Sequence, residues 1–182
     1  QGVTYRFLHD RVQQAAYGSL AESDRAQVHH DIGRGLLPAD PTALGSEQLF
    51  ELLSHFNRAI PRFVDEPGRL ELARLNLIAG TRARESVAFL AAAAYVRQGL
   101  ALLPADAWTR DYALRFSLGT LALTCESLYA GAALDEAELE QLAMHAIGAH
   151  DRARVDHIRV QYDIIRGRPA QAIEAGLRAL AS

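Results

Sequence analysis

The sequence predicts an all-α protein built from antiparallel helix pairs. Nearly every segment of its 182 residues carries apolar side chains at the spacing of one helix face, and none shows sustained alternation of apolar and polar residues. Proline and glycine interrupt this pattern at short intervals, which sets helix ends. Small residues also recur at matching places in successive helices, and this favours close packing within each pair.

Three helices are expected in the first third of the chain. The first ends at Gly18, and the second ends before Pro38. The third follows Ser46, a good N-cap residue, and Pro61 ends it. The expected ranges are 5–17, 23–37 and 46–59.

Six further helices are expected after residue 62. The fourth begins near Pro67, because proline suits the first turn of a helix. The fifth is followed by Pro104, and the last two flank a Gly-Arg-Pro turn at 167–169. The fifth, sixth and seventh helices are expected at about 85–103, 108–131 and 135–149.

A repeat pattern is visible in the fourth and fifth helices. The tetratricopeptide motif has W, L, G and Y on a first helix, and A, F and P on a second. We place Gly80 at the glycine of this motif. The A, F and P positions then fall on Ala92, Val96 and Pro104. Gly99 occupies a position where a small residue permits close helix approach.

The bulky residues of the motif are absent from this sequence. Asn76, Ala79 and Ala83 stand where the motif has Trp, Leu and Tyr. The turn-glycine and small-residue arrangement returns at Ala137 and Ala172, which are 35 positions apart. We therefore expect residues 63–182 to form a degenerate tetratricopeptide-like array.

Several segments resemble large bacterial signalling ATPases. YRFLHDRVQQAAY (5–17), RAQVHHDIGRGLL (25–37) and LLSHFNRA (52–59) resemble helices that end a winged-helix-like domain after the ATPase module. RLELA (69–73) through Pro104, WTRDY (108–112) and AQAIEAGL (170–177) resemble the helical region of proteins that combine a serine/threonine kinase-like domain, an AAA/STAND ATPase and a sensor histidine kinase.

The resemblance implies a division at residue 62 and a role without chemistry. Residues 1–62 would be the tail of the winged-helix-like domain, and 63–182 the repeat array. The chain would then be a regulatory scaffold that contacts protein segments, mostly other domains of the same cytoplasmic polypeptide. We expect the chain to be a fragment, because it begins with Gln1 and stops inside a helical pattern.

Composition excludes several function classes. The net charge is −3, which gives no electrostatic footprint for nucleic acid or an anionic membrane. All 19 basic residues are Arg, so no phosphate-loop, Schiff-base or kinase Lys exists. Cys125 is the only cysteine, and its apolar neighbours indicate an inert buried thiol in a reducing compartment. No apolar run approaches the roughly 20 residues that span a bilayer.

Candidate chemistry is weak elsewhere. His29 and His30 are adjacent, and His145 and His150 miss the spacing of a helical zinc motif. His9–Asp10 likewise gives adjacent side chains that diverge on a helix. We interpret three glutamates as a solvated helix face, at Glu136, Glu138 and Glu140. We therefore expect no catalytic residue, metal or cofactor.

The candidate interaction face consists of Arg74, Thr81 and Arg84. In the register set by Gly80, they lie on the first helix of the repeat, where arginine can pair with acidic groups of a peptide. The alternative function is a DNA-binding or ligand-sensing module, which would need an outward Arg-rich helix for DNA.

A homodimer is also predicted. The first helix would normally pack on the remainder of its domain, and its apolar residues are therefore expected to recruit a second copy. These residues are Phe7, Leu8 and Val12.

Overall fold

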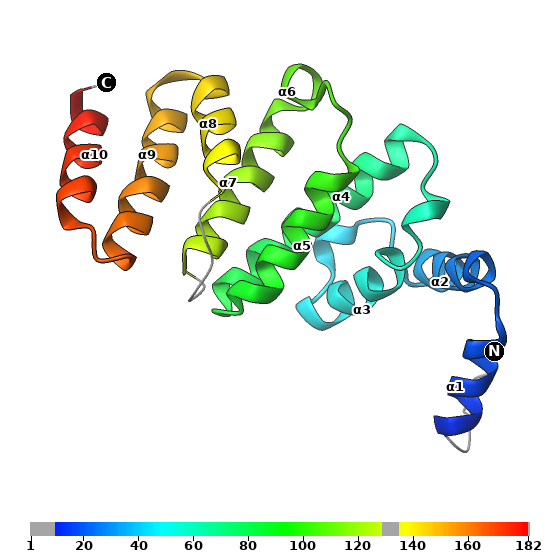
Figure 1. Cartoon of the computed structure of the whole chain (residues 1–182). Coiled ribbons are helices and arrows are strands. Elements are labelled where there is room, and N and C mark those ends of the chain that lie inside the picture. Colours follow the sequence, from blue (N-terminus) through cyan, green and yellow to red (C-terminus); the bar gives the residue numbers. More distant parts are fainter. Residues whose placement is uncertain (1–9, 129–134, 182) are drawn as a thin grey trace.

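The computed structural model describes residues 10–128 and 135–181. All regular elements in these ranges are helical, so the predicted all-α class is confirmed. Figure 1 shows the helices arranged in a row, with α1 and α2 at one end and α10 at the other. The α-helices are α1 (Asp10–Ser19), α2 (Glu22–Leu36), α3 (Ser46–Phe56), α4 (Glu66–Glu85), α5 (Phe89–Leu102), α6 (Ala107–Arg110), α7 (Tyr112–Leu128), α8 (Glu136–His145), α9 (Gly148–Ile165) and α10 (Pro169–Ala181). Two short 3₁₀ helices cover Pro41–Ala43 and Ile60–Arg62.

Two predicted helices are shorter than expected. The sixth was expected to run unbroken from 108, but Asp111 leaves helical geometry (φ −131°, ψ 43°) and separates α6 from α7. The seventh was expected to reach residue 149. It ends at His145, because Ala146 has a non-helical ψ of 121°, Ile147 is extended, and Gly148 has a φ of +75° as α9 begins. The expected end of the sixth helix at residue 131 lies outside the described residues.

The α4–α5 and α9–α10 pairs are closed by the same turn. After α4, the N–H of Ala88 donates to the carbonyl of Ala83, and Val87 adopts a φ of 61°. After α9, the N–H of Arg168 donates to the carbonyl of Asp163, and Gly167 adopts a φ of 68°. Both are Schellman motifs, which need one left-handed residue to reverse the chain. The two helices of each pair therefore run antiparallel (Figure 1).

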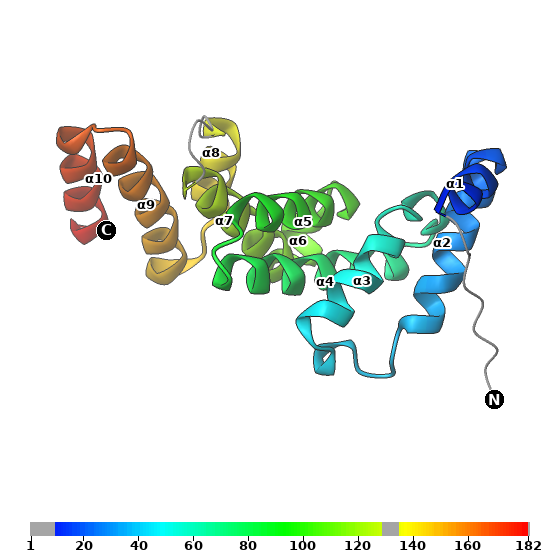
Figure 2. The same ribbon diagram turned by 90° about the horizontal axis from the view of Figure 1, so that it is seen from below.

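The main apolar core runs from α3 to α7. Leu52 and Phe56 of α3 belong to the same buried cluster as Leu72 of α4, Val96 of α5 and Leu118 of α7. The core is thus continuous across residue 62, where the sequence suggested a division. A second buried cluster joins α7 to α8 and α9. Figure 2 shows the resulting elongated stack from below.

Glycine permits the close crossing of α4 and α5. A Cβ atom on Gly80 would lie 2.5 Å from Cγ1 of Val96 and 3.3 Å from the carbonyl oxygen of Ala92, which is fully buried. Gly99 does the same on the other side of α5, where a Cβ would lie 2.8 Å from Cδ2 of Leu118 in α7. Pro104 lies just after α5, in the loop before α6.

The α7–α8 pair has the same crossing, but one residue away from the predicted position. A Cβ on Gly119 would lie 2.5 Å from Oε1 of Glu138 and 3.1 Å from Cδ2 of Leu142. Ala137 was expected to be the packing residue, but it lies on the exposed side of α8. The small side chain of this crossing is supplied by Gly119 on α7, so α8 places the larger Glu138 against it instead of Ala137.

The α9–α10 pair exchanges the small and large partners. Val160 of α9 occupies the place of Gly80, and Gly176 of α10 occupies the place of Val96, with 4.0 Å between Val160 Cγ2 and a Cβ built on the glycine. Ala172 is buried and corresponds to Ala92. One side of each crossing must be small for the backbones to approach, and either side can supply the small residue.

Candidate protein-interaction groove

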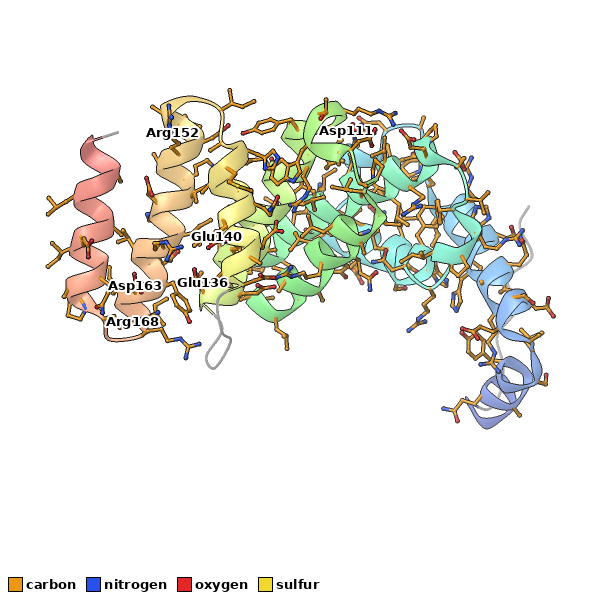
Figure 3. All side chains as sticks on the ribbon, turned by 45° about the horizontal axis from the view of Figure 1, so that its top comes forward. Asp111, Glu136, Glu140, Arg152, Asp163 and Arg168 are labelled. Carbon is orange, nitrogen blue, oxygen red and sulfur yellow. The ribbon has the colours of Figure 1, made fainter. Side chains whose placement is uncertain are left out.

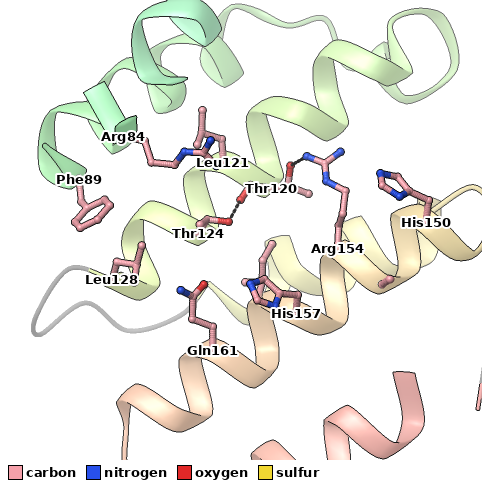
Figure 4. Close-up of a pocket in the computed structure, with 12 residues that line it drawn as sticks. Arg84, Phe89, Thr120, Leu121, Thr124, Leu128, His150, Arg154, His157 and Gln161 are labelled. Carbon is pink, nitrogen blue, oxygen red and sulfur yellow. Dashed lines mark hydrogen bonds between the residues drawn. The ribbon is translucent and has the colours of Figure 1, made fainter. Parts of the chain in front are cut away.

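A hollow of the stacked helices lies between α4, α7 and α9, which are the first helices of the three pairs. It is an open groove of about 500 Å³. One wall is formed by Arg84 of α4 and Phe89 at the start of α5, and α7 forms the floor (Figure 4). The opposite wall is the face of α9 that carries His150, Arg154 and His157.

The floor is chemically mixed because successive turns of α7 present hydroxyl and aliphatic groups. The hydroxyl of Thr120 donates to the carbonyl of Phe116 at 2.9 Å, and that of Thr124 donates to the carbonyl of Thr120 at 2.7 Å. Leu121 and Leu128 supply apolar surface beside them. The floor can therefore contact both backbone and apolar side chains of a bound chain.

The α9 wall follows directly from helical spacing. Its polar residues His150, Arg154, His157 and Gln161 recur at intervals of four, three and four positions, so they occupy one face. Figure 4 shows these side chains projecting into the groove. Nη2 of Arg154 donates to the Thr120 hydroxyl at 2.9 Å, which ties the wall to the floor.

The groove is cationic although the whole chain is acidic. None of the described Asp and Glu residues lines it, whereas Arg84 and Arg154 face it from opposite walls. The guanidinium of Arg154 lies 5.1 Å from the ring centre of Phe116, and it forms no ion pair within the described ranges. Arg84 is exposed and likewise has no ion-pair partner in the part of the chain that the structure describes. The groove therefore offers two cations to a ligand.

One acceptor in the groove is left without a donor. Oε1 of Gln161 is buried, and none of the described residues donates a hydrogen bond to it. A buried polar atom in this state costs free energy until a donor reaches it. A ligand with an N–H group would satisfy it.

The structure brings one residue of the predicted interaction face into the groove. Arg84 lines it. Arg74 lies further along α4 and pairs with Asp111 at 3.5 Å, and the Thr81 hydroxyl donates to the carbonyl of Leu77. The ten positions between the two arginines turn the helix by about 80° short of three full turns, so the side chains diverge.

The α9 wall was not predicted, although the sequence contains a signal for it. Ala92 and Ala172 are 80 positions apart, and the same shift carries Arg74 onto Arg154 and Thr81 onto Gln161. The missed residues were hidden because Val160, not glycine, occupies the small-residue position of α9.

The other groups considered for chemistry are metal-ligand types, the single cysteine and the His9–Asp10 pair. Among residues 10–128 and 135–181, no cluster of three His, Cys, Asp or Glu side chains could hold a metal ion. Cys125 is fully buried, and this burial raises the pKa of its thiol to about 11, which keeps it protonated and unreactive. His9 lies outside the described residues.

Glu138 is not part of a solvated face, contrary to the sequence interpretation. Its carboxylate accepts two hydrogen bonds from Arg115, at 2.6 and 2.8 Å, and its side chain is only 12% exposed. Glu136, by contrast, is 55% exposed and pairs with Arg159 at 3.0 Å. Burial of Glu138 follows from its place opposite Gly119, which leaves room for the carboxylate (Figure 3 labels the exposed Glu136 and Glu140).

A second polar cluster joins α1, α2 and α3. The hydroxyl of Tyr17 lies 2.9 Å from Nε2 of His29, and Nδ1 of His29 lies 2.9 Å from Nδ1 of His55. Burial is the largest cause that lowers the pKa of both imidazoles, and the positive charge of Arg58 lowers each further. The two rings therefore share a chain of hydrogen bonds in their neutral forms.

The side chains of the predicted dimer surface fall outside the part of the chain that the structure describes. Phe7 and Leu8 lie outside the described residues, and so does the side chain of Val12. The following helix, α2, exposes Val28, Ile32 and an adjoining leucine, Leu36, at successive turns. No described helix is long and apolar enough to cross a membrane.

Comparison with known proteins gives one informative match. No family model matches the chain, and no solved structure matches it. The hybrid signal transduction histidine kinase G of Dictyostelium discoideum is 29% identical to it over 140 residues. The match covers 64% of this chain and 4% of that protein, so the chain spans a small part of the relative. The chain is thus similar to a segment of a signalling histidine kinase, which agrees with the coarse part of the sequence resemblance.

Proposed function

We propose that this chain is a non-catalytic scaffold segment of a multidomain signalling ATPase or sensor kinase, and that it holds protein segments in the groove between α4, α7 and α9. The observation that carries the proposal is this groove, in which the first helices of three successive pairs converge on one open surface. Such a surface suits a bound chain segment, because repeated helix pairs create extended concave binding faces.

The tetratricopeptide-like character is part of the same proposal. Three helix pairs carry equivalent crossings, with Gly80, Gly119 and Val160 at the same place on their first helices. These residues are 39 and 41 positions apart, which is somewhat longer than the 34-residue tetratricopeptide repeat. Between Gly80 and Gly119, part of the extra length is the short helix α6, which has no counterpart in a two-helix repeat. A degenerate array of this kind would tolerate the missing bulky residues of the motif.

The signalling context is supported by the similarity to the histidine kinase segment. A scaffold between an ATPase and an output kinase would transmit a conformational state by holding or releasing neighbouring segments. A cytoplasmic location belongs to this proposal, and the buried, protonated thiol of Cys125 is compatible with a reducing compartment.

Selection of peptides from a random displayed library tests the proposal. The selection is run on the wild-type chain and on Thr124→Trp, which fills the groove floor. Gln98→Trp, on the exposed side of α5, is the matched control. We expect peptides that bind the wild type and Gln98→Trp but not Thr124→Trp. Failure to enrich any peptide, or equal binding to Thr124→Trp, would contradict the groove as the interaction site.

A further inference from the structure

We propose that the groove selects an acidic peptide segment, whose carboxylates pair with Arg84 and Arg154. This inference rests on the proposed function and specifies the chemistry of the partner. Its first support is the location of charge. The two guanidinium groups face one groove from opposite walls, α4 and α9, with no acidic residue between them.

The setting of these two cations, and not the lack of an ion pair by itself, distinguishes them, because Arg69, Arg82, Arg152 and Arg166 also have no ion-pair partner among the described residues but do not line the groove. Several arginines of the stacked helices are matched to carboxylates of the same chain, and Figure 3 labels one such pair, Asp163 and Arg168, at the end of α9. The other arginines of α4–α10 with such partners are Arg74, Arg97, Arg110, Arg115 and Arg159. The chain has more acidic than basic residues, 22 against 19, yet none of the acidic side chains that the structure describes lines the groove.

Arg154 is held in place while most of its donors remain available. A guanidinium has five N–H donors, and the Thr120 hydroxyl takes one of them. The ring of Phe116 lies against the same guanidinium and limits its motion. A fixed planar cation with free donors matches the geometry of a carboxylate, which accepts two parallel hydrogen bonds.

The unsatisfied acceptor of Gln161 favours a peptide over a simple anion as the ligand. Gln161 lies on the same face of α9 as Arg154, two helical turns further along the chain. Its Oε1 atom needs an N–H donor. An acidic peptide supplies both a carboxylate and a backbone N–H, whereas a simple anion such as sulfate supplies only acceptors. Leu121 and Leu128 add apolar contacts that a peptide can also use.

Fluorescence anisotropy with labelled peptides tests the inference. Two peptide pools of equal length are compared on the wild-type chain: one rich in Asp and Glu, and one with Asn and Gln at those positions. Each guanidinium–carboxylate bond is a charge-assisted hydrogen bond, so we expect Arg84→Gln and Arg154→Gln each to weaken binding of the acidic pool by roughly 10-fold or more. Arg152→Gln, an exposed change on α9 outside the groove, is the matched control and should leave binding unchanged.

A charge reversal keeps the test decisive if one variant folds poorly. Arg84 is exposed, so Arg84→Glu should retain the thermal midpoint of the wild type and shift its preference toward Arg-rich peptides. Equal binding of the acidic and amide pools overturns the inference and leaves the proposed function intact. Absence of binding by any peptide overturns both. Displacement of the acidic pool by inorganic phosphate, or by an oligonucleotide of equal charge, also overturns the assignment of a peptide partner.

Discussion

Replacing Val87 by glycine is expected to stabilise the protein. Val87 lies at the left-handed position of the turn between α4 and α5, with a φ of 61°, and its side chain is 69% exposed. A β-branched residue is a clear outlier in this region of backbone space. The equivalent turn between α9 and α10 uses Gly167 at a φ of 68°. The sequence thus provides the unstrained form of the same turn within one chain.

The magnitude follows from two opposing contributions. Left-handed geometry costs an L-residue roughly 1–2 kcal/mol, and glycine removes this cost. Glycine also gives the unfolded chain more freedom, which costs about 0.4–1 kcal/mol. Little apolar burial is lost, because the side chain of Val87 is mostly exposed. The free energy of unfolding should therefore rise by about 1 kcal/mol, which shifts the thermal midpoint of a chain of this size upward by about 2–4 °C.

Chemical denaturation is the appropriate assay. If the dependence of the unfolding free energy on denaturant concentration is unchanged, a shift in the midpoint concentration reports a change in stability. Val64→Gly is the matched control, since Val64 is 85% exposed and does not share the positive φ. Val64→Gly should lower the free energy of unfolding, because glycine gives the unfolded chain more conformational freedom. Gly167→Ala should also lose about 1 kcal/mol, although nothing lies within 4 Å of the added Cβ. If Val87→Gly instead behaves like Val64→Gly, backbone strain is not the property that distinguishes this turn.

Three further variants probe packing, charge and titration. Ala92→Leu should overpack the α4–α5 crossing and cost about 1–3 kcal/mol in urea denaturation. Glu138→Ala should cost about 3–5 kcal/mol because it strands a largely buried arginine, whereas Glu136→Ala, at an exposed pair, should cost about 1 kcal/mol or less. His29 and His55 have lowered pKa values in the folded state, so the unfolded state binds more protons at these residues. The free energy of unfolding should therefore fall as the pH drops below 6.5. Conversion of both histidines to Gln should reduce this pH dependence.

Each of these expectations has a contrary outcome. An unchanged midpoint for Ala92→Leu would mean that α4 and α5 do not cross closely at this residue. Equal losses for the Glu138 and Glu136 variants would show that burial of the pair has no energetic consequence. A wild-type midpoint that is constant between about pH 8 and about pH 5, or one that rises on acidification, would contradict the depressed histidine pKa values.

The helical class was accessible from the sequence because helix formation is largely local. The apolar spacing and the positions of proline and glycine specified most helix bounds within a few residues. The break at Asp111 was not visible, because no proline or glycine marks it. The break before α9 was missed as well, although Gly148 lies there, since isolated glycines also occur inside helices such as α4 and α7.

The register of α7 against α8 depends on contacts that the sequence alone does not contain. Local pattern selected Ala137 as the packing residue, because small residues usually fill a close crossing. The structure places Glu138 there, since Gly119 on the facing helix leaves the space and Arg115 supplies the compensating charge. Which side of a crossing is small is a property of two helices together, so neither helix reveals it separately.

The sequence by itself determined that the chain is helical, that the turn after α9 would reverse direction at Gly167, and that Cys125 would be buried. These are consequences of local periodicity, backbone freedom and apolar surroundings. Only the tertiary structure decided that Arg84 and Arg154, 70 positions apart, face one groove while Arg74 pairs with Asp111. The physical reason is that the directions of side chains on separate helices become fixed relative to each other only when the helices pack.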